Sequence, residues 1–121
     1  KIGYRKAEEI IHFKKLIKSC NIGLSTVILN KNFFTNQKFK FADLKTKEDY
    51  VLWIDLAKKN VKMLGLDENL SCWRKSKGSL SSSTLQKLSD GFKVYRLYLK
   101  FGIIKSLLYL FILSINFLLK K

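Results

Sequence analysis

The chain has 121 residues and carries 24 Lys and Arg against 9 Asp and Glu, which gives a formal net charge of +15. That length allows one domain, and a hydrophobic content of 47% excludes a disordered chain. The positive charge indicates a polyanionic partner, which is a nucleic acid, an anionic membrane surface or a phosphorylated substrate. Lysines far outnumber the three arginines, whereas surfaces that read bases rely on bidentate arginine.

The cysteines and the histidine of this chain do not predict a metal site. Cys20 and Cys72 stand far apart, and His12 is the single histidine. A structural zinc site needs about four ligands at close spacing. We therefore assign no metal ligand to this chain, and we expect both cysteines to be reduced and buried. The first residues are charged throughout, so no signal peptide is visible.

The N-terminal third predicts a short helix followed by a strand. Residues 8–18 place apolar side chains near helical spacing with lysines between them. Residues 22–29 are apolar and partly β-branched, with Asn21 and Asn30 at their ends, which is typical of a buried strand. We expect the polar and aromatic stretch 31–46 to form a loop.

A second helix is predicted over residues 48–60, where apolar residues recur at the spacing of a core-facing helix. Thr46 lies three residues before Asp49, a pattern that is typical of a helix start. After this helix, residues 61–64 and 70–73 are expected to form short strands around a turn.

The last third predicts a serine-rich loop at 76–83 and then helices to the end of the chain, with a break near Gly102. Residues 101–119 are strongly apolar and would extend roughly 28 Å as a helix, close to a bilayer core of about 30 Å. Lys105 and three polar residues weaken this segment as a membrane span. Three alternatives stay open: a helix in the headgroup region, a single span, and a helix packed against a missing part of the protein. Basic residues before the segment suit an anionic leaflet.

Four segments carry a resemblance to a known family. They are Cys-Asn-Ile-Gly-Leu-Ser-Thr-Val at 20–27, Glu-Asp-Tyr-Val-Leu-Trp-Ile-Asp-Leu-Ala at 48–57, Gly-Leu-Asp-Glu-Asn-Leu at 65–70 before Trp73-Arg74, and Gly-Ser-Leu-Ser-Ser at 78–82 before a basic helix and an apolar tail. Their order resembles the C-terminal, acceptor-side part of bacterial family 2 glycosyltransferases. These enzymes use nucleotide sugars, invert the anomeric configuration and have the type A fold.

The resemblance implies an α/β fold, namely the C-terminal portion of a type A, Rossmann-like glycosyltransferase. This portion would be mostly helical, with a few short strands and an apolar or amphipathic C-terminal helix. Residues 1–82 would form the acceptor-side part of the domain, and residues 83–121 would form basic and apolar helices at a membrane. No D-x-D motif occurs in the chain. We therefore expect the N-terminal nucleotide-binding half, with its divalent metal (Mg or Mn), to be missing and this fragment to be inactive alone.

The resemblance also implies roles for five residues. Asp49 would be the general base that deprotonates the acceptor hydroxyl, and Glu48 would support Asp49 or position the acceptor. Arg74 would lie toward the nucleotide diphosphate, which suits a guanidinium. Ser79 would belong to a loop that covers the site, and Trp53 would contact the substrate. Purely structural roles stay open for these residues. Acids in the first turn of a helix often cap it. Trp53 suits a core position, Arg74 suits a surface position and Ser79 suits a connecting loop.

The implied function is glycosyl transfer from a nucleotide-diphosphate sugar to a saccharide or a lipid-linked acceptor in cell-surface glycan synthesis. The expected place is the cytoplasmic face of the cell membrane, with the anionic membrane surface as a partner and no nucleic acid. The alternative is a basic protein without catalysis that binds either the membrane periphery or nucleic acid.

Overall fold

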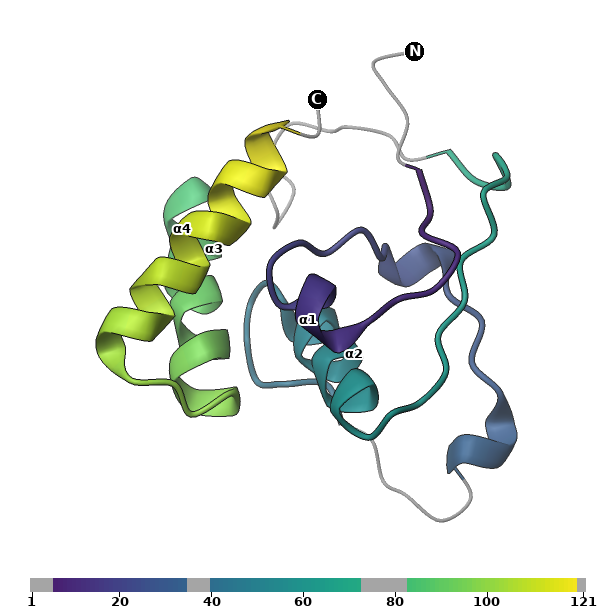
Figure 1. The fold of residues 1–121 in the computed structure, drawn as a ribbon, viewed down its shortest axis with the longest axis horizontal. Coiled ribbons are helices and arrows are strands. Elements are labelled where there is room, and N and C mark those ends of the chain that lie inside the picture. The colour runs from purple at the N-terminus through teal and green to yellow at the C-terminus, as the bar shows by residue number, and fades with distance from the viewer. Residues whose placement is uncertain (1–5, 35–39, 73–82, 120–121) are drawn as a thin grey trace.

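The computed structural model describes residues 6–34, 40–72 and 83–119. Two short helical elements, α1 (Phe13–Leu16) and the 3₁₀ turn η1 (Leu24–Thr26), come first, and a second 3₁₀ turn, η2 (Lys31–Phe34), follows. Figure 1 shows α1 beside the longer helix α2 (Glu48–Lys58), with the last helices of the chain to the left of both. The described part of the chain is therefore mostly helical.

Helix α2 is the centre of the fold because nearly all of its apolar side chains are buried. Six of its residues are at most 7% exposed: Tyr50, Leu52, Trp53, Ile54, Leu56 and Ala57. The helix predicted over 48–60 is confirmed, and it ends two residues earlier than expected, where Asn60 adopts a φ of 56°. The prediction that Thr46 starts the helix is wrong. The residue before α2 is Lys47, in the left-handed region with a φ of 70° and without a side-chain cap.

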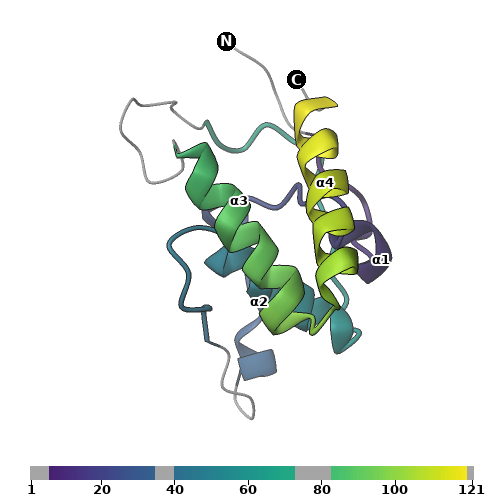
Figure 2. The ribbon, with the colours of Figure 1, turned by 90° about the vertical axis from the view of Figure 1, so that its left-hand side faces the viewer.

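The C-terminal part of the chain forms a helical hairpin. Helix α3 (Thr84–Lys93) begins at Ser83, whose hydroxyl accepts a hydrogen bond from the Gln86 N–H at 3.3 Å. A π-helical segment, η4 (Val94–Tyr98), extends α3, and the chain then turns at Lys100, with a φ of 56°. Helix α4 (Ile103–Leu119) follows, so the predicted break near Gly102 is confirmed. Figure 2 shows α3 and α4 side by side.

A close approach of the two hairpin helices requires a glycine in α3. A Cβ atom added at Gly91 would lie 2.8 Å from Cδ1 of Leu110 in α4.

No helix of the described residues is long and apolar enough to cross a membrane.

The strand predictions fail within the described residues, where no strand is present. Ile10 and Leu64 form an isolated antiparallel bridge, and the Ile11 N–H donates to the Met63 carbonyl at 3.0 Å. This extended pairing also explains why the helix predicted over 8–18 is reduced to α1. The segment 22–29 contains η1 instead of a strand, because a strand needs a neighbouring strand to hydrogen-bond. Its Ile28 side chain is 98% exposed.

The other predicted strand, at 70–73, is not formed by residues 70–72, and Trp73 lies outside the described residues, as does most of the serine-rich loop. The α/β class is therefore not seen in the described residues. Cys20 is half-buried, with its Sγ 3.8 Å from the Ile22 carbonyl oxygen, and Cys72 is exposed, so the prediction that both cysteines are buried is wrong.

One hydrophobic core joins the segments on either side of the proposed boundary at residues 82 and 83. Buried residues of α1 and α2 contact Val94, Tyr95, Leu99 and Leu113 from the hairpin. Three side chains also cap consecutive carbonyls at the end of α1. The Tyr50 hydroxyl donates to the Leu16 carbonyl at 2.8 Å, and the Tyr95 hydroxyl donates to the Ile17 carbonyl at 2.7 Å. The third is the side-chain amide of Asn116, which donates to the Lys18 carbonyl at 3.0 Å.

Candidate active site at the start of helix α2

The two acidic residues singled out in the sequence form the first turn of α2. Glu48 and Asp49 are both half-buried. The Asp49 carboxylate turns back toward its own helix, because its Oδ1 accepts a hydrogen bond from the Tyr50 N–H at 2.8 Å. The first N–H groups of a helix have no intrahelical acceptor and carry partial positive charge. The start of α2 therefore holds Asp49 where an anionic oxygen is stabilised.

Lys47 lies beside this turn. Its Nζ atom is 5.7 Å from the centroid of the Tyr50 ring, within the range of a cation–π contact. The Tyr50 hydroxyl at the other end of the ring is buried against the end of α1. Burial raises the pKa of Tyr50 well above its ordinary value, and the neighbouring Tyr95 raises it further, so the hydroxyl stays protonated. Tyr50 therefore anchors the first turn of α2 to the core.

A buried carboxylate in α3 fixes the chain just before α2. Asp90 is 1% exposed, and its Oδ2 atom accepts hydrogen bonds from the N–H and the hydroxyl of Thr46 at 2.9 and 3.0 Å. The Gln86 side-chain amide donates to the same oxygen at 2.9 Å, and Lys93 Nζ lies 3.4 Å from Oδ1. Burial alone raises the pKa of Asp90, but these hydrogen bonds outweigh it and hold the pKa below its ordinary value.

Sequence reasoning missed Asp90, although a signal was present. Asp90 is the one acidic residue after residue 68, and it stands among basic and apolar residues. Gln86 and Lys93 lie four positions before it and three after it, which places all three on one helix face. A lone carboxylate with such neighbours is typical of a structural anchor. Its long-range partner, Thr46, carries no mark in the sequence.

The remaining predicted site residues are not brought together with Asp49 in the described part of the chain. Trp53 lies one turn after Asp49 in α2, but it is 2% exposed, and its Nε1 has no hydrogen-bond partner among the described residues. It occupies a core position. Arg74 and Ser79 lie outside the described residues. The roles predicted for these three residues stay predictions.

Residues 6–34, 40–72 and 83–119 hold no group of three His, Cys, Asp or Glu side chains that could bind a metal ion. The donor set of the described residues therefore does not fit the divalent metal that the resemblance implies. Two surface hollows are present in the described residues. One is lined by residues 6–10 with Lys15, Asn21, Gly65 and Asp67, and the other lies between residues 40–43, α2 and the end of η4. Asp49 thus presents a positioned carboxylate that lines neither of these two hollows.

Comparison with known proteins identifies two relatives. The chain is 33% identical over 94 residues to the UDP-Glc:alpha-D-GlcNAc-diphosphoundecaprenol beta-1,3-glucosyltransferase WfgD of Escherichia coli, which covers 77% of the chain and 36% of that enzyme. It is 33% identical over 78 residues to WfaP of the same organism, an enzyme with the same activity in its name, which covers 64% of the chain and 30% of WfaP.

The chain spans about a third of the length of these curated relatives. No protein-family model matches the chain, and no solved structure matches it. Over 94 and 78 of its residues, the chain is thus similar to part of two bacterial glycosyltransferases.

Proposed function

We propose that this chain supplies the acceptor-side part of an inverting glycosyltransferase of family 2, with the type A fold in the complete enzyme. Its activity would be transfer of a sugar from a nucleotide-diphosphate donor to a saccharide or a lipid-linked acceptor in cell-surface glycan synthesis. The observation that carries the proposal is the 33% identity, over 77% of the chain, to an enzyme named for UDP-glucose and a diphosphoundecaprenol-linked acceptor.

In this proposal Asp49 is the general base. Its carboxylate takes the proton from the acceptor hydroxyl while that oxygen attacks the anomeric carbon of the donor. The bond from the anomeric carbon to the diphosphate oxygen breaks on the opposite face, so the configuration inverts. The position of Asp49 supports this role, because its half-buried carboxylate lies in the first turn of α2 and is oriented there by the hydrogen bond from the Tyr50 N–H. Glu48, beside it, would orient the acceptor.

The donor sugar and a divalent metal, Mg or Mn, belong in this proposal to a nucleotide-binding half outside these residues. Arg74 would then approach the diphosphate, and Ser79 and Trp53 would lie near the substrate. The reaction would take place at the cytoplasmic face of the cell membrane, where a lipid-linked acceptor is accessible and the anionic surface suits a chain of net charge +15.

Replacing the proposed base tests the mechanism directly. In the full-length protein we expect Asp49→Asn to lower kcat for sugar transfer by about 10³-fold, within the range of general-base catalysis. Asp55→Asn is the matched control, because Asp55 lies in the same helix with a half-exposed side chain that pairs with Lys59. It should leave kcat within about twofold of the natural protein.

Glu48→Gln should give an intermediate loss, because Glu48 only orients the acceptor in this proposal. Circular dichroism verifies that each variant is folded. Unchanged turnover by a folded Asp49→Asn protein would remove the assignment of Asp49 as the base.

The basic character of the chain favours one second candidate, a protein without catalysis that binds a polyanion. A nucleic-acid partner would show affinity that falls steeply with salt concentration. A full-length protein with such binding and without sugar transfer would favour this candidate.

A further inference from the structure

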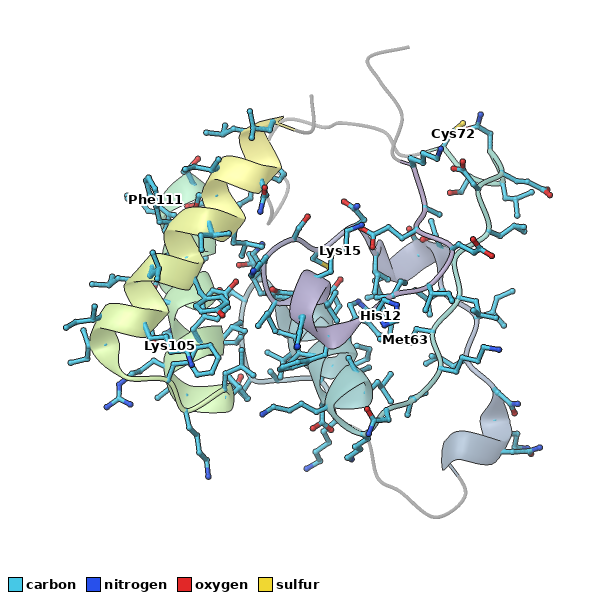
Figure 3. The ribbon with its side chains drawn as sticks, viewed as in Figure 1. His12, Lys15, Met63, Cys72, Lys105 and Phe111 are labelled. Carbon is cyan, nitrogen blue, oxygen red and sulfur yellow. The ribbon has the colours of Figure 1, made fainter. Side chains whose placement is uncertain are left out.

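Helix α4 has an apolar outer face that nothing in the described residues covers. Its inner side packs on the protein, where Ser106 and Leu113 are buried and Tyr109 and Leu110 lie against the core. Six residues, spaced by one, three or four positions as one side of a helix requires, form the outer face and are each 38% to 85% exposed: Ile104, Leu107, Leu108, Phe111, Ile115 and Leu118. Figure 3 shows Phe111 on the side of α4 that points away from α1 and α2.

The outer face is long and uninterrupted by charge. A helix of the 17 residues of α4 extends about 25 Å, and the six residues follow it from the first turn to the last. Soluble monomers rarely leave a continuous apolar surface of this kind exposed, so such a surface marks an interaction site. The exposed side chains cannot be explained by the packing of the hairpin, which uses the opposite side of α4.

Three exposed cations gather where α4 begins, and we call them the basic corner: Arg96, Lys100 and Lys105. Arg96 Nη1 donates to the Phe101 carbonyl at 3.2 Å, and Lys105 Nζ lies 4.2 Å from the centroid of the Phe101 ring. Both contacts hold the charges at the end of the outer face. The last 31 residues of the chain contain six Lys and Arg and no Asp or Glu. The region therefore presents apolar and cationic groups without a compensating acid.

We propose that the outer face of α4 lies in the interfacial layer of an anionic lipid bilayer, with the basic corner on the headgroups. A bilayer offers both complements at once, acyl chains for the apolar face and anionic headgroups for the cations. A second copy packed through the same face would cover the apolar side chains, but its last 31 residues would bring no acid to the basic corner. Because the inner side of α4 packs on its own protein, one side alone meets lipid, and the helix axis lies in the membrane plane.

This inference deepens the membrane placement in the proposed function and rests on it for the identity of the membrane. Binding of α4 to a bilayer requires no sugar transfer, however, so the two proposals fail separately. Asp49→Asn should lose transfer and keep vesicle binding. Variants of the outer face should lose vesicle binding and keep transfer to a water-soluble acceptor.

Vesicle flotation of the full chain tests the inference. We expect binding to vesicles of phosphatidylcholine and phosphatidylglycerol. Phe111→Glu should lower the partition coefficient at least about tenfold, because it removes a large apolar group and adds a negative charge. Leu66→Glu is the matched control, since Leu66 is 62% exposed and Phe111 is 63% exposed. Leu66 stands between Gly65 and Asp67, which border the hollow lined by residues 6–10.

Two further variants separate the apolar and the electrostatic contributions. Ile104→Glu repeats the first test at a side chain that is 85% exposed, where the fold loses no packing. Replacing Lys100 and Lys105 with Gln should weaken binding to anionic vesicles by about fivefold for each charge and leave binding to pure phosphatidylcholine unchanged.

Vesicle binding that is equal in Phe111→Glu, Ile104→Glu and the natural protein would overturn the inference. So would dimers of the natural chain, seen by analytical ultracentrifugation, that dissociate in both variants, because a second copy would then be the occupant. Phe111→Trp reports the depth of the helix. Lipids that carry bromine on the acyl chain near the headgroup should quench the fluorescence of this tryptophan more than lipids that carry bromine at the end of the acyl chain. The reverse order would exclude an in-plane helix.

Discussion

At the scale of single residues, Asp90 positions the candidate site without belonging to it. Its carboxylate accepts both the N–H and the hydroxyl of Thr46, three residues before Asp49. A buried carboxylate is tolerated only when hydrogen bonds and a cation compensate the loss of hydration. Thr46, Gln86 and Lys93 provide this compensation. The start of α2 is thereby tied to α3, although the two are more than thirty residues apart in sequence.

We expect Asp90→Ala to destabilise the fold by about 2 to 3 kcal/mol, because it leaves the buried donors of Thr46 without an acceptor. Asp55→Asn, which affects the half-exposed pair of Asp55 with Lys59 at the end of α2, should cost about 0.5 kcal/mol or less. Urea unfolding followed by circular dichroism measures both values. Equal stability of the two variants would show that Asp90 is not an anchor.

The same carboxylate gives the stability a defined dependence on pH. The pKa of Asp90 is lowered in the folded state from its ordinary value of 3.8. Its contribution is therefore fully present above that ordinary value and is lost as the pH falls through the lower, folded-state pKa. In Asp90→Asn this part of the acid dependence should disappear. Unfolding midpoints measured between neutral pH and pH values below the ordinary pKa of Asp90 test the expectation.

At the scale of elements, α1 is held by side chains of other helices more than by its own length. The carbonyls of Phe13, Lys15 and Leu16 accept N–H groups of residues 17–19, and these local bonds close the end of a helix that is only four residues long. Tyr50 of α2, Tyr95 of η4 and Asn116 of α4 each donate to one of three consecutive carbonyls. Burial raises the pKa of Tyr95 to about 12, so its hydroxyl remains a donor at neutral pH. The end of α1 is thus the point where three helices meet.

Tyr95→Phe should destabilise the fold by about 1 to 3 kcal/mol, because the buried Ile17 carbonyl loses its donor. Tyr98→Phe is the control from the same π-helical segment, since Tyr98 is 38% exposed, and it should change the stability by less than about 0.5 kcal/mol. Thermal and urea unfolding compare the two variants. A Tyr98→Phe protein as unstable as Tyr95→Phe would contradict this account of α1.

The spacing of apolar residues in the sequence was sufficient to predict the longer helices. The periodic apolar residues of 48–60 were sufficient to predict α2, and the hairpin with its break near Gly102 followed in the same way. The strand expected at 22–29 could not be decided locally, because a strand exists only with a partner. The acidic pair Glu48-Asp49 was placed at a helix start by sequence alone. Its support could not be predicted, since Asp90 reaches Thr46 across 44 positions.

At the scale of the whole molecule, the division at residues 82 and 83 cuts through a shared core. Val94 and Tyr95 are fully buried against residues of α1 and α2, and Leu113 of α4 belongs to the same cluster. Small proteins are stabilised by a narrow margin, so loss of such a part of the core is enough to unfold the rest. The proposed membrane helices and the acceptor-side part should therefore fold together.

We expect residues 1–82 alone to be unfolded, because removal of the hairpin exposes Tyr50 and deprives Thr46 of Asp90. Circular dichroism and the dispersion of amide NMR signals compare this fragment with the full chain. Adding residues 83–121 as a separate peptide should restore helix content if the core is shared as described. A fragment 1–82 that folds cooperatively would support two independent units.

The π-helical segment η4 has a consequence for the rotational phase of everything that follows it. A π-turn accommodates one residue more than an α-turn, and each residue turns a helix by about 100°. If Val94–Tyr98 instead continued α3 as a regular α-helix with all five residues retained, the turn at Lys100 would rotate by about a quarter of a circle. Helix α4 would then no longer meet Gly91, and its apolar side would aim in another direction. The extra residue in η4 thus acts as an angular spacer that determines where the C-terminal helix faces.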